Sequence, residues 1–182
     1  MTLTSAQLAA LAATAKALGV QPSWLEALIN FETAGTWNPQ IKNPLSSARG
    51  LIQFMDATAK AMGYPGGSAE LVAKHPTIES QLAGPVLAYL KPYMPFNTKQ
   101  EFLLSVFFPA YRKAALDTVI HANDPAAREK FQRANPGIVT VGDYVGKLEK
   151  AFMKSATKGQ AKAGAGLALL ALVGAAIFFL RS

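Results

Sequence analysis

The chain has 182 residues, a formal net charge of +7, 51% hydrophobic residues and no cysteine. This length suits one globular unit with a core of its own. The absence of cysteine excludes disulfides and thiol chemistry, and it neither requires nor excludes an oxidising compartment. The positive charge is compatible with an anionic partner, such as an acidic polymer, a phospholipid or nucleic acid. Because the basic residues are scattered and are not interleaved with aromatic residues, we expect no nucleic-acid specificity.

The first segment predicts an amphipathic helix. Thr4 and Gln7 have the spacing of a capping box, and Gly19 is typical of a helix end. Lys16 lies inside the run, and no basic region precedes it, so the segment does not resemble a signal peptide. The apolar stripe between the two ends consists of Leu8, Leu11, Ala15 and Leu18.

The second segment, residues 22–32, predicts a helix that begins at a proline and ends at an acid, Glu32. At about 100° per residue, Glu32 falls within roughly 40° of Leu28 and 20° of Leu25, so the carboxyl group continues the apolar stripe. Apolar surroundings raise the pKa of a carboxyl group, as a general acid near neutral pH requires. The alternative is a surface side chain or a paired structural charge at the edge of the stripe.

The rest of the first 157 residues also favours helices, because Ala, Leu and Lys are frequent and β-branched runs are few. Residues 33–49 predict a long loop and residues 64–69 a turn. The further helices that we expect span 51–62, 77–91 with a kink at Pro85, 99–108, 111–122, 124–134 and 141–155.

Residues 163–180 contain no charged or hydrogen-bonding side chain. As a helix they would extend about 27 Å, close to the thickness of the hydrocarbon core of a bilayer. We therefore predict three parts, namely a globular domain (1–157), a basic linker (158–162) and a transmembrane or hydrophobic anchor helix (163–180). The alternative for the last part is a buried terminal helix or an oligomerisation stem.

The run from Glu32 to Met55 resembles the signature of lytic transglycosylases of the goose-lysozyme-like, SLT-type superfamily. In that family a catalytic Glu ends a helix, and a loop with Asn-Pro leads to a Gly-Leu-Met-Gln-x-Met element. Asn38-Pro39 matches this loop, and Gly50-Leu-Ile-Gln-Phe-Met55 matches the element with Ile in place of Met. Asp56 stands where the family commonly has Pro. The resemblance implies an all-α, lysozyme-like fold.

The second half of the chain resembles the family less closely. Thr140-Val-Gly-Asp-Tyr-Val145 is similar to an element whose Tyr reaches the catalytic Glu, which implies that role for Tyr144. The family's Ala-Tyr-Asn-Ala-Gly element corresponds to Ser105-Val-Phe-Phe-Pro-Ala-Tyr111, which has no Asn. Phe107, Phe108 or Tyr111 could offer a stacking surface for sugar, and each could equally be a core aromatic residue.

The resemblance implies peptidoglycan as the substrate and Glu32 as the catalytic residue. It also implies that Tyr144 and the backbone near Met55 position Glu32 and that Gln53 contacts the saccharide. The family's substrate-orienting Ser has no clean match, so Ser47, Ser46 or Asn43 could take its place. We expect substrate contacts from Gln53, Met55, Ser47, Tyr111 and Tyr144.

The family's reaction uses one acid and leaves a 1,6-anhydro-muramic acid product.

We expect no cofactor and no metal, since His75 and His121 stand alone in the sequence and are more typical of surface or capping residues. Two alternatives stay open, a goose-type lysozyme that hydrolyses the same bond and a non-catalytic, membrane-anchored wall-binding or channel-forming protein. The hydrophobic tail and the unsignalled start of the chain favour a bacteriophage virion protein. Such a protein would contact other virion proteins and would act in the host periplasm during genome entry.

Overall fold

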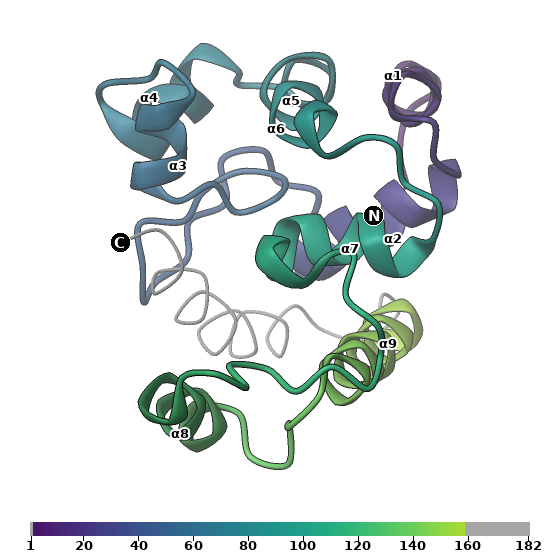
Figure 1. Ribbon diagram of the computed structural model, residues 1–182. Coiled ribbons are helices and arrows are strands. Elements are labelled where there is room, and N and C mark those ends of the chain that lie inside the picture. Colours follow the sequence, from purple (N-terminus) through teal and green to yellow (C-terminus); the bar gives the residue numbers. More distant parts are fainter. Residues whose placement is uncertain (1, 159–182) are drawn as a thin grey trace.

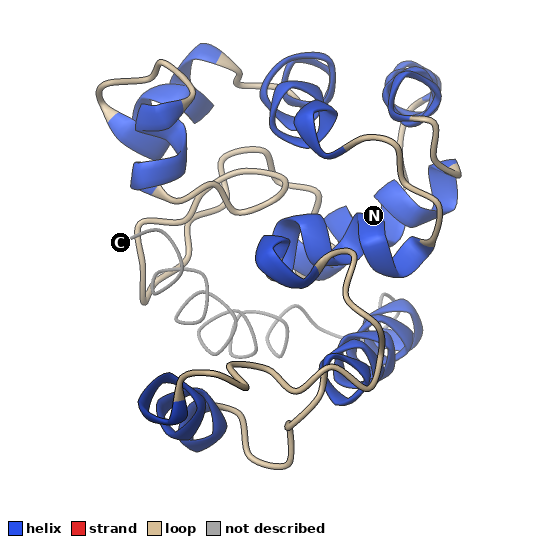
Figure 2. Ribbon diagram, viewed as in Figure 1, coloured by secondary structure: helices blue, strands red, loops and turns tan. Residues whose placement is uncertain are grey.

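The computed structural model describes residues 2–158, with side chains through residue 150, and its regular elements are all helices (Figures 1 and 2). The predicted all-α class is therefore confirmed. The longer helices are α1 (Ser5–Leu18), α2 (Pro22–Glu32), α7 (Lys99–Phe107), α8 (Pro125–Ala134) and α9 (Val141–Lys158). The shorter helices are α3 (Asp56–Ala61), α4 (Gly67–Lys74), α5 (Ile78–Gln81) and α6 (Leu87–Leu90).

The first helix begins and ends where its sequence predicts. The Thr4 side chain accepts a hydrogen bond from the Gln7 N–H, and the Gln7 side chain accepts one from the Thr4 N–H, so the capping box is closed. Gly19 ends the helix in the left-handed conformation with φ +67°. Helix α1 packs against α2, which also contacts α7 and α9.

Helix α2 lies between two groups of helices. In Figure 1, α3–α6 occupy the upper part of the molecule and α8 and α9 the lower part, with α2 and α7 between them. The apolar side of α2 is fully buried at Leu25, Leu28 and Ile29, as its pattern predicts. Burial of these side chains drives α2 into the middle of the core, and its last residue, Glu32, goes with it.

The segment 51–62 differs from the predicted helix, because α3 begins only at Asp56. Gly50 and Gln53 have φ values of +81° and +53°, and a helix cannot pass through residues with left-handed backbones. Arg49 and Phe54 instead exchange two backbone hydrogen bonds of 3.1 and 2.8 Å, which close residues 49–54 into a tight loop. The prediction was wrong because the apolar spacing after Gly50 reflects a buried loop.

The predicted kink at Pro85 is present as a widened turn. Helix α5 runs into a single π-turn, Leu82–Val86, which continues as α6 and a 3-10 turn, Lys91–Tyr93. Pro85 has no N–H to donate to the helix, and the wider turn accommodates its ring without breaking the chain direction. Helix α4, by contrast, was not predicted, and it begins at Gly67, inside the predicted turn at 64–69.

The predicted helix 111–122 was wrong. A 3-10 turn, Pro109–Tyr111, is followed by turns, and the backbone then pairs with the segment that leads into α9. The N–H groups of Ile120, Val141 and Gly142 donate to the carbonyl groups of Val139, Thr118 and Leu116 at 3.0, 2.9 and 2.7 Å. These long-range bonds satisfy backbone groups that a helix would have paired locally.

The C-terminal prediction falls largely outside the described part of the chain. Helix α9 continues to Lys158, beyond the predicted end at 155, and the linker and anchor at 159–180 lie outside the described residues. Among residues 2–158, no helix combines the length and the apolar character that a membrane crossing requires.

Candidate active site

Glu32 is an acid enclosed by the core at the C-terminal end of α2. Its exposed fraction is 2%, which excludes the alternative of a surface side chain. Burial raises the pKa of the Glu32 carboxyl well above its ordinary value, because the charged form loses its hydration. Its Oε2 atom has no hydrogen-bond partner among the described residues. The site therefore holds a carboxyl group that favours its protonated form and has a buried oxygen without a hydrogen-bond partner among the described residues.

Tyr144 lies next to this acid in space, although 112 residues separate the two in sequence. It is in the first turns of α9, which packs against α2, and its exposed fraction is 2%. Burial is the main cause that raises the pKa of the Tyr144 hydroxyl, and the negative charge of Glu32 raises it further. Its hydroxyl oxygen also has no hydrogen-bond partner among the described side chains. The phenol therefore keeps its proton and can donate it in a hydrogen bond.

Gln53 is held in an unusual conformation by the loop before α3. Its φ of +53° is uncommon for a residue with a side chain, and such conformations persist where the surrounding structure imposes them. Its Nε2 donates to the Gly50 carbonyl at 3.0 Å, while its Oε1 is buried with no partner within the described structure. The side chain is thus fixed at one end and has a free acceptor at the other.

Unpartnered buried polar atoms are rare in proteins, so their distribution is informative. Four side-chain atoms of this kind occur among the described residues, namely Glu32 Oε2, Gln53 Oε1, Tyr144 Oη and Arg112 Nε. Three of the four belong to residues that the sequence singles out as site residues. A substrate rich in hydroxyl and amide groups could supply the missing partners.

Ser47 and Asp56 belong to a polar link between the loop and two helices. The Ser47 Oγ accepts a hydrogen bond from the Asp56 N–H at 3.1 Å, and the Asp56 Oδ1 accepts from the Ser68 Oγ at 2.7 Å and from the Ser68 N–H at 2.9 Å. The Ser68 hydroxyl is the main cause that lowers the pKa of the Asp56 carboxyl. Asp56 is thus ionised, and its Oδ1 is hydrogen-bonded to Ser68 of α4, whereas the Glu32 carboxyl favours its protonated form. The role of Ser47 in substrate binding stays a prediction.

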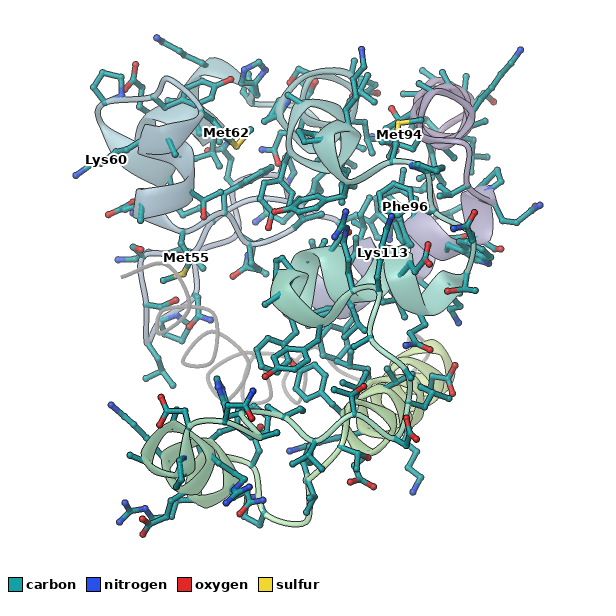
Figure 3. The ribbon with its side chains drawn as sticks, in the orientation of Figure 1. Met55, Lys60, Met62, Met94, Phe96 and Lys113 are labelled. Atoms are coloured by element: carbon teal, nitrogen blue, oxygen red, sulfur yellow. The ribbon has the colours of Figure 1, made fainter. Side chains whose placement is uncertain are left out.

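Met55 precedes α3 directly, with an extended backbone at the position that caps the helix. Figure 3 shows its side chain at the start of α3, whereas Met62 lies at the other end of the same helix. The Met55 side chain is half-buried, and its contact with substrate stays a prediction.

Residues 10–104 match the family model "Transglycosylase SLT domain", which is just over half of the chain. The chain belongs to this family. Comparison with curated proteins and comparison with solved structures each gave no match. Family membership supports lytic transglycosylase activity in general, with peptidoglycan as the substrate.

The match contains four of the predicted site residues of the SLT domain and ends before the other two. Glu32, Ser47, Gln53 and Met55 lie inside residues 10–104, and the sites of Tyr111 and Tyr144 follow it. The match therefore covers the acid and the loop, and it ends at the segment where the family's Ala-Tyr-Asn element is altered.

That altered segment of the SLT domain forms an aromatic cluster. Phe108 is 1% exposed, and its ring centroid lies 4.6 Å from that of Tyr111, 5.6 Å from Phe131 and 5.4 Å from Tyr144. Phe107 is equally buried and packs edge-on against Phe31 at 5.4 Å. Both phenylalanines are core residues, so the suggestion that they stack on sugar was wrong. The cluster instead forms an apolar wall beside Tyr144.

Tyr111 is half-buried at the edge of this cluster. Its hydroxyl oxygen accepts a hydrogen bond of 2.7 Å from the backbone N–H of His121. That bond holds the turn at His121, whose φ is +54°. A contact between Tyr111 and sugar stays a prediction for this SLT domain.

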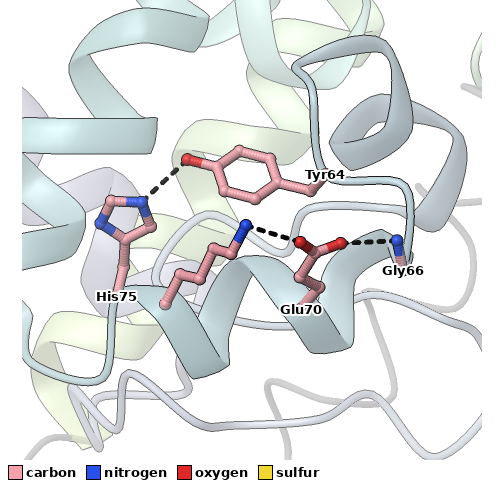
Figure 4. A network of polar contacts seen from close by, with 5 residues as sticks. Tyr64, Gly66, Glu70 and His75 are labelled. Atoms are coloured by element: carbon pink, nitrogen blue, oxygen red, sulfur yellow. Dashed lines mark hydrogen bonds and ion pairs between the residues drawn. The ribbon is translucent and has the colours of Figure 1, made fainter.

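His75 is half-buried and caps the C-terminal end of α4, where its backbone N–H donates to the Leu71 carbonyl at 3.0 Å. Its Nε2 forms a hydrogen bond of 2.8 Å with the Tyr64 hydroxyl, beside a Glu70–Lys74 ion pair of 2.7 Å on α4 (Figure 4). The predicted capping role is therefore confirmed, whereas the side-chain contacts with Tyr64 and Gly84 were not predicted, because both residues lie outside α4. Gly84 leaves room for the ring, since a Cβ there would lie 2.9 Å from the His75 Cε1.

A pocket of about 180 Å³ lies beside the loop of the SLT domain. Tyr89, one of its walls, packs edge-on against Phe54 at 6.0 Å, next to Gln53 in the chain. The sequence reasoning missed this pocket, because its aromatic residues have the spacing of an ordinary helix face. The lining consists of Thr58, Ala61, Met62, Ala88, Tyr89, Pro92 and Tyr93.

Proposed function

We propose that this SLT domain cleaves the β-1,4 bond between N-acetylmuramic acid and N-acetylglucosamine and forms a 1,6-anhydro-muramic acid end. The observation that carries the proposal is the Glu32 carboxyl, which is buried, has a raised pKa and has an oxygen without a partner. A general acid must be protonated before it reacts and must be able to reach the leaving oxygen. Glu32 meets the first requirement because it is buried.

The proposed reaction uses this acid twice. Glu32 first gives its proton to the glycosidic oxygen, and the bond between that oxygen and C1 of muramic acid breaks. The resulting Glu32 carboxylate then takes the proton from the 6-hydroxyl of the same muramic acid, whose oxygen forms a bond to C1. The proton balance closes, because Glu32 ends protonated, and no water is consumed.

A single-acid mechanism agrees with the surroundings of the other candidate carboxylate. Most glycosidases use two carboxyl groups with different tasks. Asp56 follows the Gln53–Met55 segment, but its Oδ1 accepts two hydrogen bonds from Ser68. A carboxylate that is committed to a helix start is poorly placed to activate water or to attack C1.

Tyr144 and Gln53 complete the proposed site. The neutral Tyr144 hydroxyl can donate to the Glu32 carboxylate at the stage when that group is charged. Gln53 offers its free Oε1 to a saccharide hydroxyl or N-acetyl N–H. Both roles agree with the unpartnered state of the two oxygens.

Digestion of purified peptidoglycan by the full chain in detergent, followed by mass spectrometry of the products, tests the proposal. We expect anhydro-muropeptides from the native protein and a loss of at least about 10³-fold in the rate with Glu32→Gln. Glu26→Gln is the matched control, because Glu26 is exposed on the same helix. Loss of activity in both variants, or in neither, would contradict the assignment of Glu32.

The same spectra separate the competing functions. Hydrolysis leaves a reducing muramic acid that is heavier than the anhydro product by one water, and its detection would favour a goose-type lysozyme. A folded native protein that binds peptidoglycan and releases no product would favour the non-catalytic wall-binding role.

We further propose that the activity opens the cell wall locally during phage genome entry, with residues 163–180 held in a membrane. This proposal rests on the apolar sequence of that segment, which lies outside the described residues. Detection of the protein in purified virions would support it, and detection only in the envelopes of uninfected bacteria would overturn it.

A further inference from the structure

Gln81 is a buried amide at the end of α5 that lies outside the predicted site. Its exposed fraction is 0%, and all of its hydrogen bonds go to backbone groups. Its Oε1 accepts from the Leu51 N–H at 2.9 Å. Its Nε2 donates to the carbonyl groups of Pro39 and His75 at 2.6 and 2.9 Å. One side chain thus joins the middle of the long loop at Pro39, the end of α4 at His75 and the segment that carries Gln53.

The contact between Gln81 and the loop is close. A Cβ at position 50 would lie 2.8 Å from the Gln81 Oε1, so the Gly50 backbone rests directly on the amide. Gly50 also has a φ of +81°, which a residue with a side chain rarely adopts. A glycine is therefore required at this position both by the backbone and by Gln81.

A single peptide group links Gln81 to Gln53. The Gly50–Leu51 peptide donates its N–H to Gln81, and on its other side its carbonyl accepts two hydrogen bonds from Gln53. These come from the Gln53 N–H at 3.2 Å and from its Nε2 at 3.0 Å. Because a peptide group is planar, fixing its N–H also fixes the direction of its carbonyl. Gln81 therefore fixes the orientation of the Gly50 carbonyl, which accepts the hydrogen bonds from Gln53.

We propose that Gln81 is a positioning residue that aims the free Oε1 of Gln53 at the glycan strand through the Gly50–Leu51 peptide. The inference rests on the proposed function, since it assigns the saccharide contact to Gln53. Without Gln81, the Leu51 N–H has no acceptor and the peptide can rotate, which releases both hydrogen bonds to Gln53.

A double-mutant cycle on soluble glycan strands of alternating N-acetylglucosamine and N-acetylmuramic acid tests this coupling. We expect kcat/KM to fall about tenfold with Gln53→Ala, about tenfold with Gln81→Met, and about tenfold with both, because the two residues act through one contact. A product of the two effects, about a hundredfold loss, would overturn the proposal. So would full activity of Gln81→Met.

Gln40→Met is the control for loss of an amide in the same region. The Gln40 Nε2 donates to the Val72 carbonyl at 2.8 Å, and thus ties the long loop to α4 without reaching Leu51. We expect kcat/KM of Gln40→Met to stay within about twofold of native. A loss equal to that of Gln81→Met would mean that any loosening of the loop is sufficient, and would overturn the specific role of Gln81.

Gln81→Glu covers the case in which Gln81→Met does not fold. It keeps the volume, and its carboxyl group, protonated because it is buried beside two carbonyl groups, keeps an oxygen that accepts from the Leu51 N–H and an O–H that donates to the Pro39 or His75 carbonyl. We expect it to retain activity within about threefold. A loss of tenfold or more in the folded Gln81→Glu protein would contradict the role of the acceptor oxygen.

Hydrogen exchange separates this inference from the proposed function, because it needs no activity. We expect faster exchange of the Leu51 and Gln53 amide protons in Gln81→Met than in Gln40→Met, measured by NMR. If the native protein releases no product, the proposed function fails, and the exchange rates still decide whether Gln81 fixes the peptide. Equal exchange rates in the two variants would overturn the coupling.

Discussion

The loop at 33–56 and the aromatic segment at 105–144 support the same candidate site by different means. The loop is held by hydrogen bonds between polar groups, from Leu51 to Gln81, from Ser68 to Asp56 and from Gln53 to the Gly50 carbonyl. The aromatic segment shares backbone hydrogen bonds between 116–120 and 139–142, but its side chains are held by ring packing around Phe108. Hydrogen bonds fix directions, and apolar packing excludes water. The first region can therefore aim a side chain, and the second excludes water from Tyr144, which lies next to Glu32.

The family match separates the two regions in the same way. It includes the loop and ends at residue 104, before the aromatic segment begins. A direction-setting loop tolerates few changes, because each hydrogen bond has its own partner and angle. An apolar wall tolerates many side chains that keep the volume, so its sequence can diverge while its physical effect remains.

The largest effect that we expect comes from the aromatic region. Phe108→Ala removes a fully buried ring that contacts Tyr111, Phe131 and Tyr144, and should lower the free energy of unfolding by about 3–5 kcal/mol. Chemical denaturation measures this loss. Val139→Ala is the control, because Val139 is 44% exposed, and its effect should stay within about 0.5 kcal/mol. A loss below about 1 kcal/mol for Phe108→Ala would show that the cluster is not a core.

Glu32→Gln tests whether the buried environment raises the pKa of Glu32 and thereby lowers the stability of the protein at neutral pH. The folded state raises the Glu32 pKa, so the protein is most stable below the ordinary value of 4.5 and loses stability as the pH rises through the folded pKa. Glutamine avoids this loss. We expect the variant to unfold with a free energy higher by about 1–3 kcal/mol at pH 7 and equal at pH 4 or below. An equal stability at both pH values would contradict the raised pKa.

The sequence predicts the two regions unequally well. Helix α2 and the burial of Glu32 follow from local periodicity, and the capping residues of α1 are adjacent in the chain. The tight loop at 49–54 and the pairing of 116–120 with 139–142 depend on partners that are distant in sequence, so apolar spacing indicated helices there. The role of Gln81 and the side-chain contact of His75 with Tyr64 were missed for the same reason, since the partners are backbone groups or residues from other segments. Tyr144 was predicted only through the family resemblance.

Gly50→Ala tests how tightly the loop region is specified. The alanine backbone would have to keep a φ of +81°, and its methyl group would lie 2.8 Å from the Gln81 Oε1. We expect the free energy of unfolding to fall by about 2 kcal/mol, from backbone strain and from displacement of the amide. Gly35→Ala is the matched control, because Gly35 has a φ of +75° and open space around it.

The difference between the two alanine variants measures the close contacts of the added methyl group, chiefly with the Gln81 Oε1 at 2.8 Å and also with the Val72 Cγ1 at 3.2 Å. Gly35→Ala carries the backbone strain alone and should cost about 1 kcal/mol. Thermal unfolding of both variants measures the difference. Equal losses would mean that the Gln81 side chain moves aside freely, and that the loop is specified by backbone conformation alone.

The smallest effect joins the two regions, because Tyr144 belongs to the aromatic wall and lies next to Glu32. Tyr144→Phe keeps the ring and removes the hydroxyl that can donate to the Glu32 carboxylate. We expect kcat to fall about tenfold, or about 1.4 kcal/mol in the activation free energy. Tyr64→Phe is the control, because its hydroxyl bonds His75 away from the acid.

The pH profile of Tyr144→Phe shows how the hydroxyl acts. Activity falls at high pH when Glu32 loses the proton that it must donate, so the basic limb of kcat reports the pKa of Glu32 in the complex. A donor to the carboxylate favours the charged form and lowers this pKa, while burial raises it. Removal of the hydroxyl leaves burial unopposed, and the basic limb should move to higher pH. A lower kcat with an unmoved limb would mean that Tyr144 contacts the substrate and does not modulate the acid.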